Sequence, residues 1–342
     1  MMTVQAEFPA MRLDNFPRIE CGFYPTPLEE LTRLREAIGA TCPRLFIKRD
    51  DLIGTGFGGN KVRKLDYVMA REIERGTQTV VTIAGEKSNH ARVTAAVCAR
   101  LGLRCLLVLN RAAKGVIPDG FKAASRFIYE LYGAEVRWVD SREEREATAL
   151  ALTAQLQAKG ERAAYIPLGV SFPLGALGFV RAVHEVTEQF EKIGVRPNYI
   201  FHSSSSGGTQ AGLIAGCQLF GDGRCEVIGI SPDDPANEIA ECVAEIVNGI
   251  HQLLGTDEYK ISAAQVQVLE QYIGAGYGIE TSKAIAITKM LATREGIILD
   301  PTYTAKAFAA LMDWIQNGKL TARDTILFWH TGGQLAFFYV PE

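Results

Sequence analysis

The stretch Gly54-Thr-Gly-Phe-Gly-Gly-Asn-Lys-Val-Arg-Lys-Leu-Asp-Tyr67 decides how this chain is interpreted, because it sets Lys61 where a glycine-rich turn becomes a helix. Four glycines within six positions allow positive φ angles and a close approach of the backbone to a ligand. Lys61 and Lys64 are three residues apart and share one helix face. The segment matches neither the P-loop nor the dinucleotide fingerprint. Lys61 is therefore either a reactive amine at a ligand site or a solvated lysine at the start of a surface helix.

The composition excludes several classes of protein. The chain has 342 residues, 47% of them hydrophobic, which is enough to bury a sizeable core in one or two domains. A net charge of −3 and the lack of a basic tail argue against nucleic-acid binding. No apolar signal core or membrane-length run is present, so we expect a soluble, cytoplasmic protein without a membrane partner. The seven cysteines and five histidines lack metal-ligand spacing, so no metal is predicted.

Short β-branched runs alternate with helix-length amphipathic stretches. This alternation predicts an α/β fold with parallel sheets covered on both faces, and ligand sites in the loops that follow the strands. The predicted strands are 45–48, 79–83, 105–109, 135–139, 164–166, 199–203, 227–230 and 325–329. The predicted helices are 61–75, 90–101, 121–132, 143–159, 174–190, 210–220, 282–295 and 305–316.

Two of the predicted loops carry the chemistry of an anion site. Ser88-Asn-His90 follows one strand and opens a helix, so hydroxyl, amide and first-turn N–H groups can bind a carboxylate; Ser88 or Asn89 could instead be only a helix cap. The run Ser203-Ser-Ser-Ser-Gly-Gly-Thr209 links another strand to an apolar helix. Small residues, hydroxyls and the helix dipole there favour a phosphate dianion, although serine-rich turns also occur as linkers. A glycine-framed lysine with such a cradle fits pyridoxal phosphate better than a nucleotide.

Several motifs, in this order, resemble those of one family, the fold-type II pyridoxal-phosphate enzymes of the D-cysteine desulfhydrase and 1-aminocyclopropane-1-carboxylate deaminase group. The match covers nearly the whole chain. The motifs are Thr26-Pro-Leu, Ile47-Lys-Arg-Asp-Asp51, Gly58-Gly-Asn-Lys61-Val-Arg-Lys64-Leu, Ser88-Asn-His90, Ile166-Pro-Leu-Gly169, Gly175-Ala-Leu-Gly178-Phe, Gly276-Tyr277-Gly278, Glu295-Gly-Ile-Ile-Leu-Asp300-Pro-Thr-Tyr303-Thr304 and His330-Thr-Gly-Gly333.

The resemblance implies a tryptophan synthase β-like architecture. Two open, twisted, mostly parallel sheets would be flanked by helices, with the cofactor in the cleft between two domains. The large domain would comprise residues 1–60 plus 168–342, and the small domain residues 61–167. The resemblance also suggests a homodimer.

The resemblance further implies roles for individual residues. Lys61 would bond covalently to pyridoxal phosphate and later move the substrate's α-proton, while Asn89 would contact the ring hydroxyl. Thr331 would sit at the ring nitrogen, where a neutral hydroxyl makes the ring a weaker electron sink than a carboxylate would. The remaining cofactor contacts would come from Asn60, Lys64, Ser204, Ser205, Ser206, Gly207, Gly208 and Thr209. The substrate would meet Lys87, Ser88, Asn89, His90, Phe172, Tyr277 and Tyr303; the two tyrosines could instead be packing residues.

Local departures from the family pattern bear on the substrate. The deaminases carry a glutamate after the tyrosine and a glutamine after Ser-Asn, whereas this chain has Thr304 and His90 and so looks more like the desulfhydrases and cysteate sulfo-lyases. Lys87 replaces a glutamine, and Val170 with Phe172 and Ser125 also depart from the usual residues. A second acidic group on the substrate would suit Lys87, unless that side chain extends into solvent.

These features predict a lyase that removes a β-substituent from a small amino acid. D-Cysteine, giving pyruvate, ammonia and sulfide, is the leading substrate. L-Cysteate, giving sulfite, is the alternative that Lys87 favours, and 1-aminocyclopropane-1-carboxylate deamination is a further one. A non-catalytic protein that binds pyridoxal phosphate or another phosphorylated metabolite would keep the same phosphate site. A nucleotide-dependent oxidoreductase lacks its glycine fingerprint.

Overall fold

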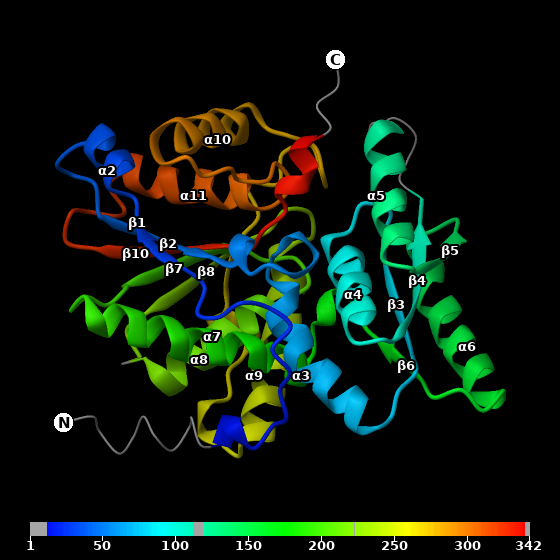
Figure 1. Ribbon diagram of the computed structural model, residues 1–342. Coiled ribbons are helices and arrows are strands. Elements are labelled where there is room, and N and C mark those ends of the chain that lie inside the picture. The colour runs from blue at the N-terminus through cyan, green and yellow to red at the C-terminus, as the bar shows by residue number, and fades with distance from the viewer. Residues whose placement is uncertain (1–11, 112–118, 222, 339–342) are drawn as a thin grey trace.

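The strands form two separate sheets, and Figure 1 shows them in two lobes that lie side by side. The computed structural model describes residues 12–111, 119–221 and 223–338. The larger sheet combines segments from both ends of the chain, whereas all strands of the smaller sheet come from its middle. The predicted fold class is confirmed.

The larger sheet has six strands in the order β1-β2-β10-β7-β8-β9. Its neighbours are parallel except for β1, which pairs antiparallel with β2. The strands are β1 (Leu28–Glu30), β2 (Arg44–Arg49), β7 (Tyr199–Ser203), β8 (Glu226–Ile230), β9 (Gln267–Leu269) and β10 (Thr325–His330). The central strand β10 is buried at every position, as expected where helices cover both faces of a parallel sheet.

Helices cover both faces of this sheet, as Figure 1 shows. On one face lie α2 (Thr32–Ile38), α10 (Ser282–Glu295) and α11 (Thr304–Gln316). On the other lie α7 (Pro173–Lys192), α8 (Gly208–Phe220) and α9 (Ala236–Leu254). Helix α3 (Lys61–Glu74) packs between α7 and the helix α4 (Asn89–Arg100) of the smaller sheet.

The smaller sheet has four parallel strands in the order β5-β4-β3-β6. They are β3 (Thr79–Gly85), β4 (Arg104–Asn110), β5 (Glu135–Val139) and β6 (Ala163–Ile166). Its flanking helices are α4 (Asn89–Arg100), α5 (Asp119–Leu131) and α6 (Glu144–Ala158). Alternate β3 residues enter different clusters: Val80 and Ala84 pack with the α4 side, and Val81 and Ile83 pack with Ala149 of α6.

Two glycines let α7 hold α3 and α8 close together. A Cβ at Gly178 would lie 2.1 Å from the carbonyl oxygen of Arg63 in α3. A Cβ at Gly212 of α8 would lie 2.4 Å from the carbonyl oxygen of Ala176 in α7. Both α3, which begins with Lys61, and α8, which follows the serine-rich loop, are thus packed against α7.

All eight predicted strands and all eight predicted helices are confirmed, with ends that differ by at most two residues. The strands β1 and β9 and the helices α2 and α9 were not predicted. Helix α9 buries Ile239, Val243, Val247 and Ile250, whose spacing was visible in the sequence. Its many β-branched residues gave it a strand-like composition.

The division into residues 1–60 plus 168–342 and residues 61–167 stays a prediction. Helix α3, which begins at the predicted boundary, packs against both α7 and α4. Every helix in the described part of the chain is too short or too polar to cross a membrane.

Candidate active site

One cavity of about 580 Å³ lies where the carboxyl ends of strands from both sheets meet. Most of the residues singled out in the sequence line it: Asn60, Lys61, Lys87, Ser88, Asn89, His90, Ser204, Ser205, Ser206, Gly207, Thr209, Tyr277, Tyr303 and Thr331. Lys64, Gly208 and Phe172 do not. The strand-end rule therefore brings together segments that are far apart in the sequence.

Lys61 is the first residue of α3, after a turn in which Gly54, Gly56, Gly58 and Gly59 all have positive φ angles. Its Nζ donates a hydrogen bond to Asn60 Oδ1 at 3.0 Å. Burial, and then the charge of Arg92, lowers the pKa of the amine to about 8 from 10.5. Near physiological pH a larger fraction of Lys61 is thus neutral than of an ordinary lysine, and the neutral amine is the nucleophilic form.

Asn60 connects the lysine to two other segments of the cavity wall. Its Nδ2 donates to Thr209 Oγ1 at 2.9 Å, and its backbone N–H donates to the Thr331 carbonyl at 3.1 Å. The approach to Thr331 depends on glycine, since a Cβ at Gly59 would lie 2.9 Å from the Thr331 oxygen. The start of α3 is therefore positioned by the loops after β7 and β10.

The loop between β7 and α8 has the geometry of an anion site. Gly207, with φ of 75°, caps α8, and the first amides of the helix follow directly. Ser204 Oγ is buried and has no hydrogen-bond partner among the described residues. Free hydroxyl capacity beside a helix N-terminus suits a bound oxyanion.

Lys64 lies behind this loop. Its Nζ donates to the Gly169 carbonyl and to Ser171 Oγ, each at 3.1 Å. Ser171 Oγ in turn lies 2.7 Å from Ser206 Oγ and accepts from the Gly208 N–H at 3.3 Å. Burial, and then the charge of Lys61, lowers the pKa of Lys64 well below its usual value. A cation buried without a carboxylate contact is costly, and an anion on the loop would offset that cost.

The loop before α4 presents Ser88, Asn89 and His90 to the cavity. Ser88 Oγ caps the helix by accepting from the His90 and Ala91 N–H groups, which leaves its own proton available. Asn89 Oδ1 accepts from Arg92 at 2.8 Å. His90 Nε2 lies 2.8 Å from Thr82 Oγ1, and burial with the charge of Lys61 lowers the pKa of His90 to about 3. His90 is therefore neutral at physiological pH.

Two tyrosines from distant segments meet at the cavity. The hydroxyls of Tyr277 and Tyr303 form a hydrogen bond. Lys87 Nζ lies 5.4 Å from the centre of the Tyr277 ring, so this side chain is held at the site by a cation–π contact. Burial and the neighbouring Tyr277 phenol raise the pKa of Tyr303 well above its usual value.

Phe172 packs elsewhere, with its ring 5.6 Å from the guanidinium carbon of Arg71. Its contact with a substrate stays a prediction. Val170 has φ of 52° and is fully buried, an unusual conformation for a β-branched residue.

Sequence reasoning missed several polar residues of the cavity wall, namely Asn110, Arg142, Arg145, Asp233 and Asp234. All of them come from segments at the ends of strands: Asn110 ends β4, the arginines follow β5 and the aspartates follow β8. The rule that ligand sites follow strands could have found them. The sequence analysis considered only glycine- and serine-rich loops, and so it did not select these charged loops.

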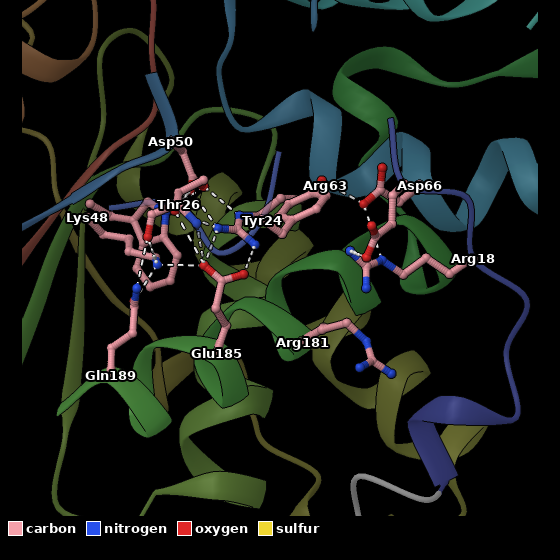
Figure 2. Close-up of polar contacts among 12 residues, drawn as sticks. Arg18, Tyr24, Thr26, Lys48, Asp50, Arg63, Asp66, Arg181, Glu185 and Gln189 are labelled. Carbon is pink, nitrogen blue, oxygen red and sulfur yellow. Dashed lines mark hydrogen bonds and ion pairs between the residues drawn. The ribbon is translucent and has the colours of Figure 1, made fainter. Parts of the chain in front are cut away.

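A buried ion-pair network, which we call the α3 support network, lies under the start of α3 (Figure 2). It consists of Thr26, Lys48, Asp50, Arg63, Glu185 and Trp329. Glu185 contacts Lys48 at 2.6 Å and Arg63 at 3.0 Å, and Arg63 contacts Asp50 at 2.8 Å. Asp50 also accepts from Thr26 at 2.9 Å and from the Trp329 indole at 2.7 Å. The motifs that contain Thr26 and Asp50 thus join the strands β2 and β10 to α3 and α7.

Comparison with known proteins gives consistent matches. Residues 19–332 match the model of the family described as pyridoxal-phosphate dependent enzyme. The chain is 34% identical over 336 residues to the D-cysteine desulfhydrases of Salmonella newport strain SL254 and Salmonella heidelberg strain SL476, covering 98% of this chain and 99% of each relative.

Solved structures match over a similar length. A crystal structure of an ACC deaminase homologue superposes with a TM-score of 0.83 at 33% identity, covering 97% of this chain and 95% of that one. The crystal structure of a T.th. threonine deaminase gives a TM-score of 0.63 at 20% identity, over 96% of this chain and 97% of that one, which supports the fold alone.

Proposed function

The chain belongs to the pyridoxal-phosphate dependent enzymes, within the ACC deaminase and D-cysteine desulfhydrase group, and from this premise we propose that it catalyses α,β-elimination from a small amino acid with a leaving group at Cβ. D-Cysteine is the leading substrate, and its products are pyruvate, ammonia and sulfide. The names of the 34% identical relatives support this choice. The observation that carries the proposal is the Lys61 amine, held at the cavity wall by Asn60 with its pKa lowered to about 8.

The residues present fit the cofactor. The buried Ser204 hydroxyl lacks a partner among the described residues, and the helix N-terminus beside it favours an oxyanion. We assign the phosphate to the loop Ser204, Ser205, Ser206, Gly207, Gly208 and Thr209, with Lys64 supplying positive charge from behind it. Lys61 would bond covalently to the aldehyde carbon of the cofactor. Asn89 would contact the ring hydroxyl and Thr331 the ring nitrogen, and Asn60 would make a further contact with the cofactor.

Side chains of the protein would bind the substrate and move the protons. When bound, pyridoxal phosphate supplies an electron sink that weakens the bonds to the substrate's α-carbon. Ser88 would donate its hydroxyl proton to the substrate carboxylate, since its lone pairs already accept the His90 and Ala91 N–H groups. Lys61, once free as a neutral amine, would take the proton from Cα. The hydroxyls of Tyr277 and Tyr303, which are hydrogen-bonded to each other, would pass a proton to the departing group.

L-Cysteate, which would release sulfite, is the second candidate substrate. The observation that favours it is the partly buried Lys87 ammonium at the cavity wall, which lies against the Tyr277 ring. A sulfonate would add a negative charge for this cation to bind.

The test is a product assay on purified holoenzyme with D- and L-amino acids that bear thiol, sulfonate, chloride or hydroxyl at Cβ. We expect pyruvate and ammonia with D-cysteine, and loss of both activity and yellow colour in Lys61→Ala with the fold unchanged by circular dichroism. Colour without turnover of any of these compounds would favour a non-catalytic pyridoxal-phosphate protein and end the lyase proposal.

A further inference from the structure

Helix α11 carries a buried lysine that none of the roles above uses. Lys306 is 1% exposed and does not line the cavity. Its Nζ donates to three main-chain carbonyls, those of Ile273 at 2.7 Å, Gly276 at 3.1 Å and Pro232 at 3.4 Å. An ammonium has three N–H donors, so these contacts use its full donor capacity. Lys306 therefore connects α11 to the loops that follow β8 and β9.

The surroundings of Lys306 explain why its ammonium stays with these carbonyls. The residue lies in the first turn of α11, where the positive end of the helix dipole opposes its charge. Burial lowers the pKa of Lys306, and the carboxylates of Asp233 and Asp300 partly offset this effect. A buried cation needs hydrogen-bond acceptors, and the carbonyl oxygens supply them at close range.

The loop after β9 gains an anchor from this lysine. Gly276 and Gly278, on either side of Tyr277, have positive φ angles. Glycine loses more conformational entropy on ordering than any other residue, so such a loop is intrinsically loose. The Gly276 carbonyl accepts from both Lys306 Nζ and the Ile279 N–H, the latter at 3.3 Å. These two bonds fix the peptide group directly before Tyr277.

The other tyrosine of the pair is fixed by the start of the same helix. Tyr303 directly precedes α11, and its N–H donates to Asp300 Oδ2 at 2.9 Å. Asp300 Oδ1 accepts from the Thr304 N–H at 2.7 Å. The hydroxyls of Tyr303 and Tyr277 bond to each other at the cavity. Helix α11 thus holds Tyr303 through its N-terminus and Tyr277 through Lys306.

We propose that Lys306 is a positioning residue for departure of the leaving group, because its bonds to the loop carbonyls hold the Tyr277 hydroxyl against Tyr303. The inference rests on the proposed lyase function and adds a residue to it. A hydrosulfide that leaves with both bonding electrons takes a proton from the tyrosine pair to give hydrogen sulfide, and the pair regains a proton from water. Chloride leaves with the electrons and needs no proton. A misplaced Tyr277 should therefore slow the departure of sulfur and not that of chloride.

The kinetic test uses Lys306→Met, which removes the ammonium and keeps a side chain of similar length. We expect kcat for cysteine to fall at least about tenfold with KM changed less than about twofold. For 3-chloroalanine of the same configuration, kcat should change less than about twofold. Lys306→Gln keeps an N–H donor and should show the same pattern at a smaller size, which also serves if the methionine variant does not fold.

A double-mutant cycle tests whether Lys306 acts through Tyr277. In a Tyr277→Phe background, Lys306→Met should lower kcat for cysteine no further, because the hydroxyl that it positions is already gone. Lys283→Met is the matched control: this exposed lysine starts α10 and pairs with Asp313 of α11. It should leave both rates unchanged.

Hydrogen exchange followed by mass spectrometry tests the anchor without turnover. Lys306→Met should speed exchange in residues 270–281 at least about tenfold, and Lys283→Met should not. Unchanged exchange there, an equal fall in kcat with both substrates, or a full effect of Lys306→Met in the Tyr277→Phe background would each overturn the inference. The proposed lyase fails on a different result, the absence of pyruvate from every substrate, so the two failures are distinguishable.

Discussion

The Lys61 amine differs from a surface lysine because burial and Arg92 lower its pKa to about 8. Only the neutral amine can bond to the cofactor's aldehyde carbon. We therefore predict that the rate at which apoprotein takes up pyridoxal phosphate rises about tenfold per pH unit below pH 8 and levels off above it. Stopped-flow absorbance measures this rate.

Arg92→Gln should move the midpoint of that profile to higher pH, because it removes a cation that disfavours protonation of Lys61. Arg100→Gln, at the other end of α4, is the control and should leave it in place. A rate that climbs without a plateau to pH 10.5, the ordinary lysine value, would contradict the prediction.

Ser88 combines a structural role with the proposed binding role. Ser88→Ala removes the cap of α4 and should cost about 1 kcal/mol of unfolding free energy. It should also raise KM for the substrate by about tenfold, since a hydroxyl donor to the carboxylate is lost. Urea denaturation and steady-state kinetics measure the two effects.

Thr281→Ala provides the control for Ser88→Ala, because Thr281 caps α10 by accepting from the Ala284 N–H at 3.1 Å and does not line the cavity. It should show a similar loss of stability with KM unchanged. Equal KM values for the two variants would contradict the binding role of Ser88 and leave only its role as a helix cap.

At the scale of elements, the α3 support network ties α3 to α7 and to the centre of the larger sheet. Burial alone would raise the pKa of Glu185, but Arg63 and Lys48 outweigh it and lower the pKa to about 2 from 4.5. Glu185→Gln leaves the buried Lys48 without its carboxylate and Arg63 with Asp50 alone. We therefore predict a loss of about 3–5 kcal/mol in unfolding free energy at pH 7. Chemical denaturation followed by tryptophan fluorescence measures it.

The pH dependence of this difference follows from the direction of the shift. The pKa of Glu185 is lower in the folded state, so its stabilisation is present above pH 4.5 and is lost as the pH falls towards 2. The gap between wild type and Glu185→Gln should shrink over that range. Glu188→Gln, further along α7 and with a side chain 57% exposed, should change stability by less than about 0.5 kcal/mol. Equal effects of the two substitutions would contradict a special role for the network.

At the scale of the whole molecule, the cavity joins two sheets that are otherwise separate. A ligand that binds only the folded chain stabilises it by about 4 kcal/mol at a thousandfold excess over Kd. We predict that removing pyridoxal phosphate lowers the Tm by several degrees, as measured by differential scanning calorimetry.

Pyridoxal, which lacks the phosphate, should restore less of the Tm than pyridoxal phosphate does, because the serine-rich loop then receives no dianion. An equal rise with both compounds would contradict the phosphate assignment of that loop. The homodimer implied by the family resemblance stays a prediction.

The sequence predicted the elements around the cavity well, because strand and helix periods are local properties. It predicted the segments of Lys61, Ser88, Ser204 and Tyr303, whose local motifs are unusual. It did not predict Arg145, which sits in an ordinary charged helix start, Arg-Glu-Glu-Arg-Glu at 142–146. Only its burial and its place on the cavity wall distinguish it from a solvated residue.

The sequence by itself determined the alternating fold and the family, and it singled out Lys61 as the proposed reactive lysine, because each depends on residue type and spacing along the chain. The tertiary structure decided what surrounds that lysine: which carboxylates neutralise Arg63 and Lys48, and how far the pKa of Lys61 falls. These properties depend on desolvation and on distances between segments that lie far apart in the chain. The glycine turn before Lys61 allows the close approach, and the packing of α3 against α7 and α8 fixes what it approaches.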